Sequence, residues 1–369
     1  LTGIIQISAG FSHTCFLKNN GKAYCLGNNS SGQLGVGDKI NKTTPTKVEL
    51  NNIQQISAGY SHTCFLKNNG DAYCAGINNF GQLGLGDKIN RTTPTKVDSL
   101  TDIKQISAGA SHTCFLKMGG EAYCTGLGSN GQLGTAVPTT VENPFKTTPD
   151  RVALDNIKQI SAGYNHTCFL TNNGEAYCTG SNEEGQLGLN FSRSVPHIVD
   201  LDNIKQIAAG GSHTCFLKNN GEAYCTGSNE EGQLGVGDEE KKSKPTKVAL
   251  NNIAQIIAGV LKSCFVLESG KTICSPLTVC TDEQYESQAY TEISDRVCSD
   301  LTVCTASEWE SQAPTATSNR ECRALTVCKE SEYQSRIPLP TSDRECRPLT
   351  VCTAGENEIQ APTPTSDRV

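Results

Sequence analysis

The stretch IQISAGFSHTCFLKNNGKAYC, residues 5–25, decides the fold because the chain repeats it. Four near copies and one weaker copy follow, and the two cysteines of the stretch recur in each of them. In five of the six units a GQLG block and a strand resembling PTKV complete the unit. A repeat of roughly 50 residues built from short strands is typical of a β-propeller blade. The first cysteines of the six units are Cys15, Cys64, Cys114, Cys168, Cys215 and Cys264.

Each unit is predicted to supply about four short strands and no helix. Ile5 and Ile7 alternate with polar residues, which is the period of a strand. Asn19-Asn20-Gly21 separates two further strands and is typical of a hairpin turn. The sixth unit is degenerate, with Lys262 in place of the repeated histidine, as terminal repeats often are. We therefore expect an all-β fold, with a propeller over residues 1–275 that has six blades, or seven if strands precede Leu1.

The repeated positions resemble the regulator of chromosome condensation repeat family. The resemblance implies a β-propeller, usually of seven blades, and nucleotide exchange on a small GTPase as one activity open to such propellers. This chain departs from the family in having six hairpins and five GQLG blocks. It also has Cys25 where the family often carries Trp or another large residue, with Cys15 added across the hairpin. The matching residues of the first unit are Gly10, His13, Thr14, Leu17, Gly21, Tyr24, Gly27, residues 32–37 and Pro45.

The two cysteines of each unit lie ten residues apart and are predicted to form a disulfide. With Asn20 at the centre of the hairpin, Cys15 faces Cys25, and opposed residues have Cα atoms roughly 4.5–5.5 Å apart. That separation suits a disulfide, whereas zinc sites favour cysteines two to four residues apart. The predicted pairs are Cys15–Cys25, Cys64–Cys74, Cys114–Cys124, Cys168–Cys178, Cys215–Cys225 and Cys264–Cys274.

Residues 276–369 contain a second repeat, most clearly LTVCTASEWESQAPTATSNREC at residues 301–322. Its cysteines recur every 24 residues and allow two pairings. A short pairing, Cys274–Cys280 and its equivalents, would leave Cys264 unpaired. A long pairing leaves only Cys352 unpaired and is preferred. It also implies that further repeats follow in the intact protein. The long pairing joins Cys280–Cys298, Cys304–Cys322 and Cys328–Cys346.

This second repeat resembles the short cysteine-rich repeats of tumour necrosis factor receptors. The resemblance rests on Cys304, Trp309, Pro314 and the run from Ser318 to Cys322. The receptor modules contain more cysteines per unit, so receptor activity does not follow. A segment so poor in apolar residues needs disulfides to hold its fold. We interpret residues 276–369 as an elongated stalk that acts as a spacer, with ligand binding as the alternative.

No pattern of catalytic or metal-binding residues stands out. Five of the six histidines occupy one repeat position, which indicates a structural role rather than catalysis. The sixth, His197, is expected in a loop. Asp38 and its equivalents Asp87 and Asp238 are interpreted as turn caps, with calcium binding as the alternative. The chain is therefore predicted not to be an enzyme and to use neither metal nor cofactor.

Composition indicates an extracellular or cell-surface protein. The 19 cysteines suit an oxidising compartment. The chain has a net charge of −7 and no basic stripe, which disfavours nucleic acid as a partner. No run of 18 apolar residues exists, so no membrane insertion is expected in this segment. Loop sequons at Asn41, Asn90 and Asn190 predict glycosylation if the source is eukaryotic.

The loops of the third and fourth units are the predicted contact surface. The third unit carries a longer segment, Thr135–Lys146, with Val137, Val141 and Phe145, and the fourth places Phe191 in loop 189–197. Exposed apolar residues on loops suggest a site for a protein partner, either foreign or a second copy; alternatively, the two phenylalanines cover the blade edge. The predicted function is extracellular recognition or assembly, with a filament or coat subunit, or a GTPase exchange factor, as alternatives.

Overall fold

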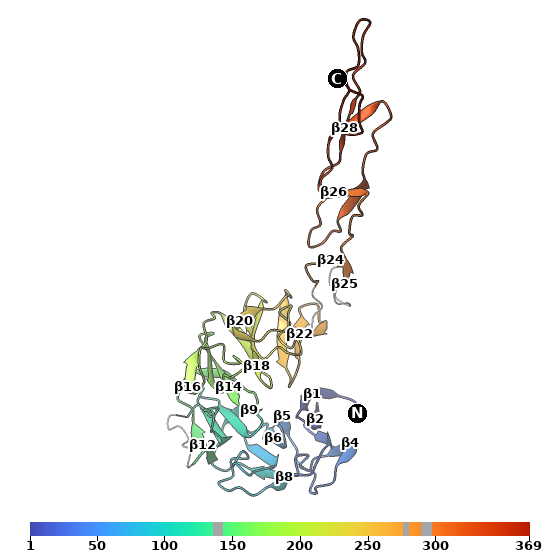
Figure 1. Ribbon diagram of the computed structural model, residues 1–369. Coiled ribbons are helices and arrows are strands. Elements are labelled where there is room, and N and C mark those ends of the chain that lie inside the picture. Colours follow the sequence, from blue (N-terminus) through green and yellow to red (C-terminus); the bar gives the residue numbers. More distant parts are fainter. Residues whose placement is uncertain (136–142, 276–279, 289–296) are drawn as a thin grey trace. The chain divides into compact units, whose positions relative to one another are not determined.

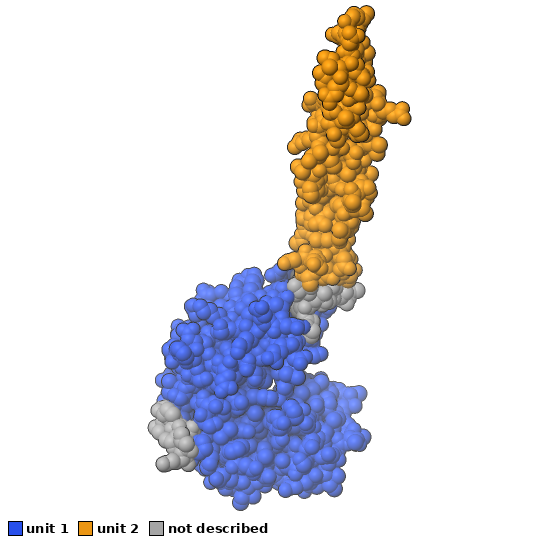
Figure 2. Space-filling model, in the orientation of Figure 1, with its two compact units in different colours: residues 1–277 blue, residues 278–369 orange. Residues whose placement is uncertain are grey.

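The computed structural model describes residues 1–135, 143–275, 280–288 and 297–369, and these contain β-strands and no α-helix. They form two compact units, Leu1–Leu277 and Thr278–Val369 (Figures 1 and 2). Within the described residues, no helix is long and apolar enough to cross a membrane. The two units are described separately below.

The first unit is a six-bladed β-propeller, as predicted. Five blades are four-stranded antiparallel sheets and the sixth has three described strands (Figure 1). Blade 1 contains β1 (Ile4–Ala9), β2 (His13–Lys18), β3 (Ala23–Gly27) and β4 (Lys42–Lys47). The later strands are β5 (Ile53–Ala58), β6 (His62–Lys67), β7 (Ala72–Gly76), β8 (Arg91–Lys96), β9 (Ile103–Ala108), β10 (His112–Lys117), β11 (Ala122–Leu127), β12 (Phe145–Arg151), β13 (Ile157–Ala162), β14 (His166–Thr171), β15 (Ala176–Gly180), β16 (Arg193–Ile198), β17 (Ile204–Ala209), β18 (His213–Lys218), β19 (Ala223–Gly227), β20 (Lys242–Lys247), β21 (Ile253–Ala258), β22 (Ser263–Leu267) and β23 (Thr272–Cys274).

A tight hairpin in each blade sets the register of its two cysteines. In blade 1 the turn contains Gly21 at a φ of 72°, a conformation that glycine adopts without a steric penalty. Cys15 of β2 therefore faces Cys25 of β3, and the two form a disulfide with Cα atoms 4.1 Å apart. The same bridge recurs as Cys64–Cys74, Cys114–Cys124, Cys168–Cys178, Cys215–Cys225 and Cys264–Cys274.

The hydrophobic core lies between successive blades rather than inside one. Leu17 and Leu34 of blade 1 pack with Ile56 and Phe65 of blade 2, and the Cys15–Cys25 bridge belongs to the same cluster. A single twisted sheet has no apolar interior of its own, so each blade must bury its face against its neighbour. The disulfides of the first five blades are consequently inaccessible to solvent.

The ring of blades is open between blade 6 and blade 1 (Figure 2). Ile7 of β1 is 62% exposed, whereas its equivalent Ile56 in blade 2 is buried between two blades. On the other side of the opening, Cys264 is half-buried and Cys274 is exposed. The two terminal blades therefore each present a face that the other blades bury.

The second unit is a series of disulfide-bonded hairpins. Its strands are β24 (Gln284–Gln288), β25 (Val297–Asp300), β26 (Glu308–Gln312), β27 (Glu321–Ala324), β28 (Glu332–Arg336) and β29 (Glu345–Pro348). The long pairing is the one formed, as Cys280–Cys298, Cys304–Cys322 and Cys328–Cys346, and Cys352 is free. None of the described residues in this unit is fully buried, so the bridges substitute for a core.

Candidate binding surfaces

The five repeated histidines join neighbouring blades. The Nε2 atom of His13 lies 2.7 Å from the Thr63 hydroxyl in blade 2, and that hydroxyl donates to the Gln33 carbonyl oxygen. Because the hydroxyl proton is already used, His13 must donate its Nε2 proton to the Thr63 oxygen. The contact therefore joins two neighbouring blades, which is a structural role of the kind predicted. The equivalent bonds are His62–Thr113, His112–Thr167, His166–Thr214 and His213–Ser263.

Burial keeps these histidines neutral. It lowers the pKa of His13 and His213 to about 4. The pKa values of His62, His112 and His166 fall to about 3, again mainly through burial, with neighbouring histidines adding to the shift. No Nδ1 atom among the five has a hydrogen-bond partner.

The other polar candidates are held in structural contacts. Asp38 accepts hydrogen bonds from Asn29 Nδ2 and the Ile40 backbone, and it forms an ion pair with Lys42. The hydrogen bond from Lys42 is the largest cause that lowers the pKa of Asp38. Asp87 and Asp238 make the equivalent contacts, so all three cap their loops. His197 lies in β16 rather than in the loop that sequence analysis expected, and its side chain is exposed.

The predicted contact loops differ from each other in structure. Val137 and Val141 lie outside the described residues. Phe145 begins β12 and is half-buried, with Lys88 Nζ 4.1 Å from the centre of its ring, so it packs against blade 2 instead of lying free in a loop. Phe191 is 70% exposed. Of the described members of this surface, Phe191 alone is a free apolar side chain of the predicted kind.

The three predicted glycosylation sites lie outside the strands. Asn41 and Asn190 are exposed, and Asn90 is partly exposed. The side-chain oxygens of Asn41 and Asn90 accept hydrogen bonds from the backbones of Asn29 and Asn78. A glycan joins the amide nitrogen, so these bonds would persist in a glycosylated chain. Modification stays a prediction.

A cavity near the ends of the innermost strands is a site that sequence analysis missed. It is lined by the Ala-Gly turns that follow the first strand of all six blades, and its volume is about 140 Å³. We call it the axial cavity. The signal was present in the sequence, since the residue after each Ala-Gly pair varies while its neighbours repeat. The varying residues are Phe11, Tyr60, Ala110, Tyr164, Gly211 and Val260.

Three of these residues form an aromatic cluster at the axial cavity. The rings of Phe11 and Tyr60 stack with centroids 4.1 Å apart, and Tyr164 meets Tyr60 edge-on at 5.9 Å. Phe11 is 51% exposed and Tyr60 39% exposed. The Tyr164 hydroxyl is buried and has no hydrogen-bond partner. The cluster thus combines exposed aromatic rings with one unsatisfied polar atom.

The wall of this cavity requires glycine at the inner turns. A Cβ on Gly109 would lie 2.4 Å from the carbonyl oxygen of Gly163 in the next blade and 2.3 Å from His112 Cε1. Only glycine allows the inner turns of neighbouring blades to approach so closely.

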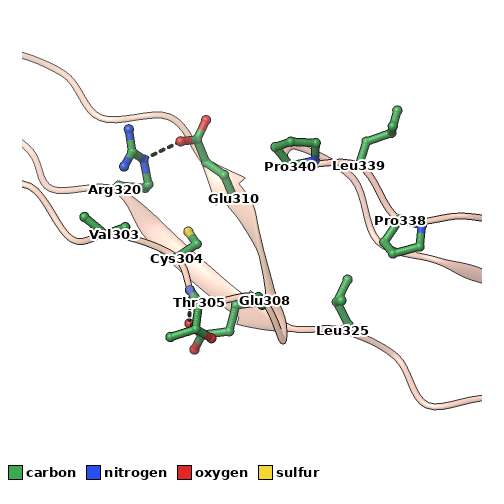
Figure 3. A pocket seen from close by; sticks show the side chains of 11 residues that line it. Val303, Cys304, Thr305, Glu308, Glu310, Arg320, Leu325, Pro338, Leu339 and Pro340 are labelled. Carbon is green, nitrogen blue, oxygen red and sulfur yellow. Dashed lines mark hydrogen bonds and ion pairs between the residues drawn. The ribbon is translucent and has the colours of Figure 1, made fainter.

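The second unit contains a groove at each junction between hairpins. Figure 3 shows one of about 500 Å³, in which Val303 and Leu325 lie across from Pro338, Leu339 and Pro340 of the next hairpin. The backbone nitrogen of Glu310 donates to the Pro340 carbonyl at 2.7 Å, and Glu310 pairs with Arg320. Similar grooves occur 24 residues before and after. Their lining residues are the contacts that stack one hairpin on the next.

Sequence comparison places the first unit in a known family. The family description "Regulator of chromosome condensation (RCC1) repeat" matches residues 20–66, 69–116, 119–170, 173–217 and 220–266, more than half of the chain. A second description of the same repeat matches residues 4–33, 53–82, 103–132, 157–186 and 204–233. The chain belongs to the RCC1 repeat family.

Several solved structures resemble this chain. Prp20p of Saccharomyces cerevisiae is 25% identical, with a TM-score of 0.62, and the match covers 70% of this chain and 67% of that one. Yeast Prp20 bound to Kap60 is 25% identical, with a TM-score of 0.66, over 73% and 69% of the two chains. Human WBSCR16 is 23% identical, with a TM-score of 0.62, over 70% of each chain, which shows the fold alone. Prp20p is described as binding Gsp1p and histones.

Proposed function

We propose that the chain is an extracellular or cell-surface recognition protein whose RCC1-type propeller contacts other proteins. In this proposal the cysteine-rich second unit, of the kind found in tumour necrosis factor receptors, is a spacer. The protein binds rather than catalyses, and it uses no cofactor.

The nine disulfides are the observation that carries the proposal. Every blade has one and the second unit has three. Disulfides persist in oxidising compartments and are rare in the cytosol and nucleus. Each blade bridge joins cysteines ten residues apart and so closes only a short loop. The bridged cysteines nevertheless lie in the core between blades, so their reduction to free thiols would change the packing of that core.

The compartment can be tested on protein purified from its natural source with free thiols blocked at lysis. Peptide mapping without reduction should recover Cys114–Cys124 and its equivalents as closed pairs, together with Cys304–Cys322. Free thiols at most of these positions would contradict an extracellular location.

Phe191 supplies the test of protein contact. A photoreactive phenylalanine analogue at position 191 should cross-link the native protein to a partner at the surface of the producing cells. The same analogue at Ile40, an equally exposed apolar residue in a loop of blade 1, is the matched control. Adducts at position 191 and none at position 40 support a contact surface on blade 4. Equal labelling at both, or none at either, removes that surface from the proposal.

An extracellular filament or coat subunit is the second candidate. The observation in its favour is the open ring, whose terminal blades both expose apolar residues, including Ile7 and Ile257. Size-exclusion chromatography and electron microscopy of native material separate the two functions. Regular polymers identify a structural subunit, and monomers identify a binding protein.

Nucleotide exchange on a small GTPase is a third candidate, favoured by the 25% identity to Prp20p. The disulfides argue against it, because disulfides are rare in the reducing cytosol and nucleus. Release of labelled GDP from purified Gsp1p, with Prp20p as the positive control, tests it directly.

A further inference from the structure

Three lysines occupy the same repeat position in the consecutive blades 3, 4 and 5. We propose that Lys104, Lys158 and Lys205 together bind a ligand that carries several sulfate or phosphate groups. This site goes beyond the proposed function and contains no residue of the surface around Phe191.

The three lysines lie on the innermost strands of the propeller. Each is the second residue of its strand, in β9, β13 and β17, and the Ala-Gly ends of these strands line the axial cavity. A strand rises roughly 3.3 Å per residue, so each lysine lies about 13 Å along its strand from the alanine at the other end. The lysines therefore surround the axis of the ring at the end opposite the axial cavity.

A β-bulge removes each of these side chains from the regular alternation of its strand. The residues before and after Lys104 pair with adjacent residues of β10, so Lys104 is the extra residue of the bulge. The same shift occurs at Lys158 and Lys205. A bulge re-aims the side chain of its extra residue. The other blades carry no charge at this position, with Ile5, Gln54 and Ala254.

The lysines of neighbouring blades are brought close by the contacts between first strands. Lys205 Nζ lies 3.5 Å from the carbonyl oxygen of Ile253, the first residue of the next blade's inner strand. The glutamine after each lysine spans the same gap, since Gln105 bonds to both backbone groups of Ile160. A glutamine side chain is short, so consecutive first strands lie near each other. One ligand with several charges can therefore reach amines from more than one blade.

The positive charge of these lysines is not neutralised by the protein. All three are half-buried, and within the described residues none of them forms an ion pair. A charge that has lost part of its hydration is stabilised by an opposite charge close to it. The acids that precede the lysines have other partners, which are Arg151 for Asp155, Lys218 for Asp202 and the Thr101 hydroxyl for Asp102.

The kind of cation selects the kind of anion. Lysine binds a phosphate group as a point charge, whereas bidentate recognition of a carboxylate uses the planar fork of arginine. All three positions have lysine and none has arginine. A single anion cannot contact amines on three blades, so a ligand with several anionic groups is favoured. Phosphorylated small molecules and sulfated polysaccharides share this chemistry.

The test is isothermal titration calorimetry of the full chain with inositol hexakisphosphate and with a heparin hexasaccharide. We expect saturable binding that weakens as salt is added, because salt screens the charges. The probe that binds more tightly identifies the source of the anionic groups. Replacing the three lysines by Gln should weaken binding roughly a hundredfold, at about fivefold for each lost charge. Replacing them by Arg keeps the charge and should keep the binding.

The matched control removes three other positive charges. Lys39, Lys244 and Lys262 are exposed and lie away from the inner strands, so their replacement by Gln should alter affinity by less than about twofold. An equal loss in this variant and in the Gln variant of the inner lysines would overturn the inference.

Three further results would contradict it. They are an absence of saturable binding of both probes, a loss of affinity in the Arg variant as large as in the Gln variant, and tighter binding of a hexaglutamate peptide than of either probe. Disulfide mapping and cross-linking through Phe191 do not involve these lysines. The proposed function and this inference can therefore fail separately.

Discussion

At the residue scale, the buried histidines couple the stability of the propeller to pH. Each is neutral in the folded chain with a pKa of about 3 or 4, against about 6.5 when exposed. The unfolded chain therefore binds more protons between these values. Stability is fully present above about pH 6.5 and falls as the pH drops toward 4, with a slope approaching about 1.4 kcal/mol per pH unit for each histidine.

We predict that His112→Gln reduces this pH dependence. Glutamine can donate to the Thr167 hydroxyl without titrating, so the free energy of unfolding should fall less steeply between pH 6 and 4. Urea unfolding at several pH values measures the slope. His197→Gln, on the exposed surface of β16, should leave the slope unchanged. An unaltered slope in His112→Gln would show that the histidines do not control acid stability.

A second prediction at this scale concerns the inner glycines. Gly109→Ala should destabilise the propeller by about 2–3 kcal/mol, because the new Cβ would overlap the Gly163 carbonyl and His112. Gly259→Ala in blade 6 is the control, since its nearest neighbour would be Lys262 O at 3.4 Å, and it should change stability by no more than about 0.5 kcal/mol. Similar effects of the two substitutions on the thermal midpoint would contradict the close approach of neighbouring inner turns.

At the element scale, the six hairpins are alike in register but differ in environment. The bridges of the first five blades are buried by the following blade, whereas Cys274 of blade 6 is exposed. Thiol–disulfide exchange needs access to a sulfur atom. The reactivity of each hairpin's disulfide toward a reductant therefore depends on the position of its blade in the ring.

We predict that Cys264–Cys274 is reduced before the other hairpin bridges. Stepwise treatment with a phosphine reductant, followed by alkylation and peptide mapping, should label Cys264 and Cys274 while Cys114 and Cys124 stay joined. Reduction of all six pairs at one reductant concentration would mean that the terminal blade is as protected as the internal ones.

At the scale of the whole molecule, the two units are stabilised in different ways. The propeller buries apolar side chains between blades, whereas the described residues of the second unit include none that is fully buried. The bridges should therefore be needed for the fold of residues 278–369 and be less critical for the propeller.

Trp309, the one tryptophan of the chain, reports this difference because it lies in the second unit. We predict that the double substitution of Cys304 and Cys322 by Ser shifts its fluorescence to longer wavelength. The far-ultraviolet circular dichroism of the propeller should persist. The matched pair, Cys264 and Cys274 replaced by Ser, should leave Trp309 emission unchanged. An unchanged emission in the first variant would show that the hairpin folds without its bridge.

Local features of the chain were accessible from the sequence. The blade repeat, the hairpin at Asn19-Asn20-Gly21 and the opposition of Cys15 and Cys25 depend on residues within about 25 positions of one another. Strand alternation and turn chemistry act over that range. The spacing of the second repeat likewise favoured the long pairing that the structure contains.

Contacts between blades were decided by the tertiary structure alone. His13 bonds to Thr63 of the next blade, Phe145 packs beneath Lys88, and Phe11 meets Tyr60 and Tyr164 beside the axial cavity. These partners lie roughly 50 or more positions apart in the chain. The sequence pattern of a single blade does not specify which of its faces a neighbouring blade covers. Ring geometry brings them together, and the same geometry leaves the first and last blades uncovered, because a blade's core is completed by its neighbour.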